Sequence, residues 1–185
     1  RVSFAVTSGQ FVLLQIGTYD PDEGTISLHL RLLELANDYF ANAQVIPSAL
    51  PQNVQGHNMG ATVEAGEQDP FSTRDNTVWY SWTPQVTQRV ELNTEGTGSN
   101  SWAAVYTGAT LATLTKIAEN DVGVGTTIQA ARLRFDAVAG TTYYFQLGTQ
   151  WADAELIFML FAAPLCPHDH FADALVLGAA LPQSL

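Results

Sequence analysis

The chain has 185 residues and a mass of 20.0 kDa, with seven basic and eighteen acidic residues, so its formal net charge at pH 7 is −11. DNA, RNA and anionic membrane surfaces reward clustered Lys and Arg, so this charge excludes nucleic acid and disfavours an anionic membrane surface. Apolar residue types make up 46% of the chain, enough for a core, yet no apolar run reaches the ~20 residues of a membrane-spanning helix.

The chain matches itself at an offset of 131 residues. Residues 1–54 align without a gap with residues 132–185 and are identical at 17 of the 54 positions, whereas chance gives roughly one match in sixteen. A period of 131 residues exceeds the roughly 20 to 50 residues of solenoid repeats and equals the usual size of a domain. We therefore predict tandem repeats, with 1–34 as the end of one domain, 35–165 as a complete domain and 166–185 as the beginning of another.

The first predicted strand covers residues 12–16, and its copy covers residues 143–147. Alternate positions are apolar in both copies, which predicts one side facing the core. The other side carries Gln15 and its copy Gln146, and we expect it to be solvated. The predicted core side consists of Val12, Leu14 and Ile16 and of their copies Tyr143, Phe145 and Leu147.

The second predicted strand is read in two copies as well, at residues 26–31 and 157–162. Ile26, Leu28 and Leu30 align with Ile157, Met159 and Phe161, and we expect this side to face the core. The opposite side changes from Ser27, His29 and Arg31 to Phe158, Leu160 and Ala162.

This change of the second side from polar to apolar has two interpretations. It is either a locally buried corner or an exposed contact patch, because contiguous apolar surface on a soluble protein marks an interface. The second interpretation predicts an assembly interface for which Phe158 and Leu160 are the first candidates and Trp102 and Trp151 the next. In that case Phe158→Asp should reduce assembly without unfolding the domain.

The centre of the complete unit predicts further short strands separated by turn signals at close intervals. A helical turn is expected only within residues 30–43, with Asn37 and Asp38 as its cap. Evenly spaced short strands with little helical periodicity predict an all-β fold, an antiparallel β-sandwich of the jelly-roll type. The expected strands cover residues 61–64, 77–83, 89–93, 103–107, 114–118 and 128–135.

Six short motifs follow one another through the complete unit in a fixed order. They are NDYFANA (37–43), NMG (58–60), ATVEAGE (61–67), VWYSWTP (78–84), AVYTG (104–108), and Phe135 followed by AGTTYY (139–144). In this order they resemble the bacterial extracellular β-sandwich repeats related to the pre-peptidase C-terminal domain. The resemblance implies a non-catalytic structural or accessory module of secreted and cell-surface proteins, often in tandem. Many relatives carry Phe-Asp-Thr where this chain has Asn100, Ser101 and Trp102, and losing that acid weakens any calcium site it helped to build.

Nothing in the sequence supports catalysis. There is no G-x-S-x-G elbow, and none of the four histidines has a supporting motif. The single cysteine, Cys166, aligns with Leu35, so no cysteine framework is shared between the repeats. We therefore expect no enzymatic activity and no catalytic residue.

Two groups of residues are candidate metal ligands. His168, Asp169 and His170 have the spacing of zinc ligands, but only the aspartate is shared with the aligned residues 37–39, which favours a turn. Calcium suits the carboxylates of two Gly-flanked loops better, although of the first loop only Asp22 aligns with another aspartate, Asp153. The calcium candidates are Asp20, Asp22, Glu23, Glu119 and Asp121.

The sequence therefore predicts an extracellular or cell-surface structural repeat without a required cofactor. Its expected partners are neighbouring repeats and further copies of itself, joined head to tail or laterally into a fibre, stalk or surface layer. The alternative is an accessory binding module of a secreted hydrolase or adhesin, which contacts glycans or a substrate surface through Trp79, Trp102 or Trp151.

Overall fold

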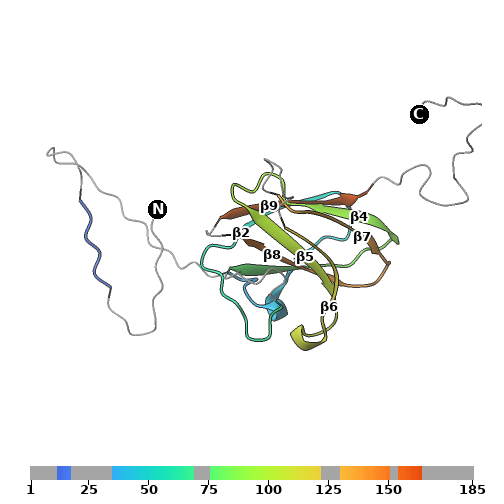
Figure 1. The fold of residues 1–185 in the computed structure, drawn as a ribbon, viewed down its shortest axis with the longest axis horizontal. Coiled ribbons are helices and arrows are strands. Elements are labelled where there is room, and N and C mark those ends of the chain that lie inside the picture. The colour runs from blue at the N-terminus through green and yellow to red at the C-terminus, as the bar shows by residue number, and fades with distance from the viewer. Residues whose placement is uncertain (1–11, 18–34, 69–75, 122–129, 151–153, 164–185) are drawn as a thin grey trace, which may run out of the picture.

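Nine strands in the described part of the chain form two sheets that face each other (Figure 1). The computed structural model describes residues 12–17, 35–68, 76–121, 130–150 and 154–163. The predicted all-β sandwich is confirmed. Two short 3-10 helices, η1 (Phe40–Asn42) and η2 (Leu111–Thr113), lie between strands.

Sheet A has five strands and sheet B has four. Sheet A has the order β1-β3-β8-β5-β6, and β1 runs parallel to β3 while all other pairs are antiparallel. Its strands are β1 (Gln44–Ile46), β3 (Thr77–Trp82), β8 (Tyr143–Thr149), β5 (Ser101–Thr107) and β6 (Thr115–Asn120). Sheet B is antiparallel throughout, with the order β2 (Gln52–His57), β9 (Glu155–Ala162), β4 (Gln88–Asn93) and β7 (Arg132–Ala137).

The core lies between the two sheets and is rich in aromatic rings. Tyr143, Phe145 and Leu147 face it from β8, as their period of two predicts. The ring of Phe158, on β9 of the opposite sheet, meets Tyr80 at a centroid distance of 4.9 Å and Phe145 at 6.5 Å. Such edge-to-face pairs stabilise the domain beyond what the burial of the rings alone provides.

Sheet A is covered on its outer face as well. All six residues of β3 are buried, and Trp79 packs on the outer side with Phe40 and Tyr106. Gln146 also lies on this side, but the prediction that it is solvated is wrong, because the segment containing Glu67 and Gln68 covers it. A period of two shows which side a residue takes, but it does not show whether a second layer covers that side.

The predicted orientation of β9 is wrong by one residue. Phe158 and Leu160 are fully buried and face the core, whereas the opposite side carries Ile157, Met159 and Phe161, which are half-buried. Every residue from 156 to 161 is apolar, so the strand itself has no alternation, and the ungapped alignment with residues 26–31 chose the wrong side. Pairing Ile26 with position 156, an offset of 130, would remove the conflict.

Several other local predictions differ from the structure. Residues 61–64 form no strand, and β1 and β2 were not predicted, since β2 is largely polar. The helical turn η1 exists, but Asn37 and Asp38 do not cap it; they bind Trp79 and Thr62 instead. The apolar side of residues 12–16 is exposed rather than buried, because no strand in the described part of the chain pairs with it.

Candidate interaction surface

Three of the four residues predicted as an assembly interface are buried and do not form one. Phe158, Leu160 and Trp102 have no exposed surface, so they cannot contact a neighbour without unfolding. Trp102 packs on Gly148, and Trp151 lies outside the described residues. Trp79 is fully buried too, which removes Trp79 and Trp102 as stacking platforms for sugars.

The predicted calcium ligands are not brought together in the described part of the chain. Asp20, Asp22 and Glu23 lie outside it, as do His168 and His170. Glu119 belongs to β6 and pairs with Lys116 at 2.7 Å. No group of three or more His, Cys, Asp or Glu residues suited to a metal occurs among the described residues.

Polar residues of the motifs hold the covering layer on sheet A. The Glu67 carboxylate accepts hydrogen bonds from the Thr77 hydroxyl, from Trp79 Nε1 at 2.7 Å and from Gln146 Nε2 at 3.1 Å. Burial raises the pKa of the Glu67 carboxyl, although these donors and the backbone N–H of Glu64 oppose the shift. The group is fully partnered and its role is structural.

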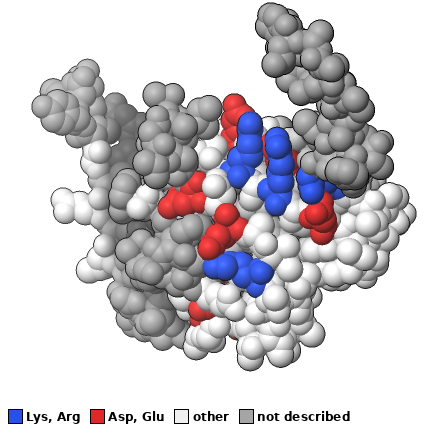
Figure 2. All heavy atoms as spheres, turned by 45° about the vertical axis from the view of Figure 1, so that its right-hand side comes forward, with Lys and Arg blue, Asp and Glu red and all other residues white. Residues whose placement is uncertain are grey.

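Sheet B, in contrast, has no second layer over its outer face among the described residues, and its four strands each carry one row of side chains there. The row on β9 is apolar and half-buried, the row on β2 is polar, and the rows on β4 and β7 are mostly charged. Figure 2 shows basic and acidic side chains beside one another on the surface. Sequence reasoning missed this face because it placed the β9 row in the core. The rows are Asn53 and Gln55; Ile157, Met159 and Phe161; Arg89, Glu91 and Asn93; and Arg132, Arg134 and Asp136.

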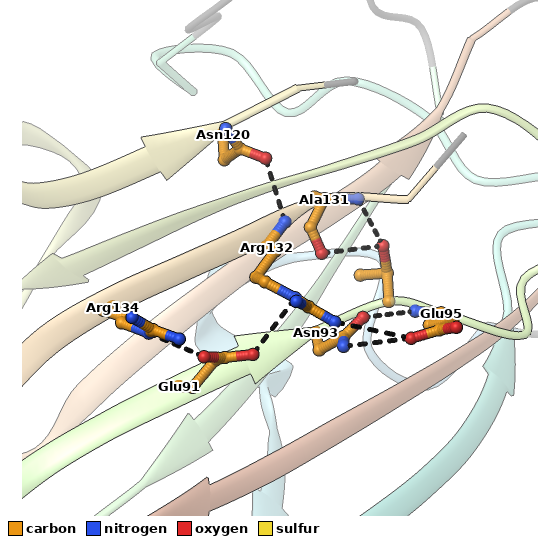
Figure 3. A network of polar contacts seen from close by, with 8 residues as sticks. Glu91, Asn93, Glu95, Asn120, Ala131, Arg132 and Arg134 are labelled. Carbon is orange, nitrogen blue, oxygen red and sulfur yellow. Dashed lines mark hydrogen bonds and ion pairs between the residues drawn. The ribbon is translucent and has the colours of Figure 1, made fainter. Parts of the chain in front are cut away.

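A buried carboxylate lies at the centre of the charged rows. Glu91 is 3% exposed and binds Arg134 Nε at 2.6 Å and Arg132 Nε at 3.1 Å (Figure 3). Arg132 also reaches Glu95 at 3.5 Å. A separate pair, Arg89 with Asp136, is exposed, and its hydrogen bond lowers the pKa of Asp136.

The ion pairs of Glu91 with Arg132 and Arg134 predict that removing the arginines destabilises the domain more than removing the carboxylate. Replacing Arg132 and Arg134 together by Met should lower the free energy of unfolding by about 3–5 kcal/mol, because Glu91 then keeps a buried charge without a cation. Glu91→Gln leaves two guanidinium groups that are 57% and 60% exposed, which water can solvate, so its cost should be about 1 kcal/mol or less. Urea unfolding measures the free energy of unfolding of both variants. If both lost the same amount, the interpretation of Glu91 as a charge shielded from water would be wrong.

The chain enters and leaves the sandwich at opposite ends. Near the start of β3, the Asn37 carbonyl accepts a hydrogen bond from Trp79 N. At the same end of the sandwich, Asn58 Nδ2 donates to the Asn76 carbonyl and to the Thr149 hydroxyl. We call this end, where Leu35 precedes Asn37 in the chain, the Leu35 end. At the opposite end of the sandwich, just after β3, the Pro84 carbonyl accepts a hydrogen bond from Gly140 N at 2.8 Å.

The last described residue, Ala163, lies at that second end, where its N–H donates to the Arg89 carbonyl at 2.9 Å. We call this the Ala163 end. In Figure 1 the β9 arrow, whose tip leads to the Ala163 end, points to the right.

No family model and no curated protein matches the chain. Among solved structures it is similar to PliG from Aeromonas hydrophila, a periplasmic inhibitor of g-type lysozyme, with 14% identity, a TM-score of 0.43, and coverage of 65% of this chain and 96% of that one. It is also similar to the pre-peptidase C-terminal domain of collagenase from Bacillus anthracis, with 12% identity, a TM-score of 0.41, and coverage of 65% and 94%. At these identities both likenesses concern the fold alone. Among the described residues, no helix is long and apolar enough to cross a membrane.

Proposed function

We propose that the chain is a non-catalytic structural repeat of a secreted or cell-surface protein, which forms an extracellular fibre, stalk or surface layer through contacts between domains. The observation that carries this proposal is the path of the chain. Leu35 and Ala163 lie at opposite ends of the sandwich, so repeats joined in sequence extend along one axis instead of folding back. A head-to-tail contact of this kind is heterologous, and it produces an open filament when its rotation does not close a ring.

The burial pattern also supports an assembly role over a binding pocket. The described tryptophans lie inside the domain, and the polar cluster around Glu67 is satisfied by its own hydrogen bonds. The outer face of sheet B is broad and mixed in character, which suits contact with another protein surface.

Electron microscopy of the native extracellular material tests the proposal. The eight residues of β9 span about 26 Å at about 3.3 Å per residue, so one domain with its end loops should give an axial repeat of roughly 40 Å. Filaments with this repeat, or twice it, are the expected result. Dispersed particles that carry one or two such domains behind a hydrolase would instead support the accessory binding module.

A further inference from the structure

We propose that the two turns at the Ala163 end form the docking surface for the Leu35 end of the next repeat in the same chain. These turns cover residues 83–87, between β3 and β4, and residues 138–142, between β7 and β8. The inference rests on the proposed function and adds to it the place where consecutive domains meet.

The first argument is the length of the connection. The offset of 131 residues aligns Cys166 with Leu35, and Leu35 already packs against the core of its own domain. Only Pro164 and Leu165 then separate Ala163 from the next repeat. Three Cα steps span at most about 11 Å, so two bodies of domain size joined in this way must touch at these ends.

The second argument is the apolar character of the turns. Val86 is 62% exposed and Val138 is 52% exposed. Exposed apolar residues on neighbouring turns mark a contact site when a partner is held nearby, and a short covalent link gives that partner a high effective concentration.

The third argument is that the two turns are held together as one surface. Gly140 N donates to Pro84 O at 2.8 Å, and Ala139 N donates to the Thr87 hydroxyl at 3.0 Å. The hydroxyls of Thr83 and Thr142 are 2.9 Å apart and share a hydrogen bond. Docking on turns that are already ordered loses little conformational entropy.

Hydroxyl-radical footprinting tests the inference by measuring the oxidation rates of individual side chains. The 185-residue chain, in dilute solution, is compared with the native protein that carries consecutive repeats. We expect the oxidation of Val86 and Val138 to fall several-fold in the native protein. Ile117, which is 43% exposed on β6, is the matched control and should react equally in both samples.

Two results would overturn the inference: unchanged oxidation of Val86 and Val138, or an equal fall at Ile117, which would show general covering of the domain. The footprint is independent of the microscopy. Filaments with unprotected turns would leave the proposed function standing without this junction, whereas protected turns in dispersed particles would support the junction and overturn the fibre.

Discussion

Phe158→Asp is expected to unfold the domain. Phe158 has no exposed surface and packs between Tyr80 and Phe145 in the centre of the core. Truncating a buried Phe to Ala costs about 3–5 kcal/mol, and a carboxylate at the same place adds several kcal/mol for a desolvated charge. Domains have only about 5–15 kcal/mol of stability, so circular dichroism and one-dimensional NMR should show no folded population.

A matched pair on the same strand separates the two orientations of β9. Phe158→Ser should destabilise by about 4 kcal/mol or more, since it combines a cavity with a buried hydroxyl. Phe161→Ser lies on the half-buried outer side and should cost roughly 1 kcal/mol. Serine avoids placing an acid at position 161, opposite Glu91. If Phe161→Ser were the more damaging variant, Phe161 and not Phe158 would face the core, as the sequence interpretation of this strand expected.

The sequence predicted best where polar and apolar residues alternate. On β8 the positions of Phe145 and Leu147 were clear, because Gln146 separates them and Gly148 follows. β9 has no such contrast, so nothing local distinguishes Phe158 from Phe161. Its orientation is fixed by the pairs it makes with β2 and β4, which a sequence does not display.

The covering of sheet A was not predictable for a similar reason. Gln146 has the polarity of a surface residue, and it is buried because the Glu67 carboxylate and the Gln68 carbonyl accept its hydrogen bonds. The acceptors lie 78 and 79 residues away in the chain. The motif around Glu67 indicated a family, but only the fold shows that it holds a second layer.

Gly148→Ala is expected to cost about 2–3 kcal/mol through overpacking. A Cβ at this position would lie 2.6 Å from Cε2 and Cζ2 of Trp102. The indole ring is rigid and fully buried, and β8 is held between β3 and β5, so neither side can move away easily. Urea unfolding of the domain measures the loss.

Gly98→Ala is the matched control, because no atom lies within 4 Å of the Cβ it would add. It should change stability by no more than about 0.5 kcal/mol. A double-mutant cycle identifies the partner of the clash: with Trp102→Leu in place, the indole is absent and Gly148→Ala should lose most of its additional cost. A cost that stayed the same in that background would place the requirement for glycine in the backbone of β8 and not in the ring of Trp102.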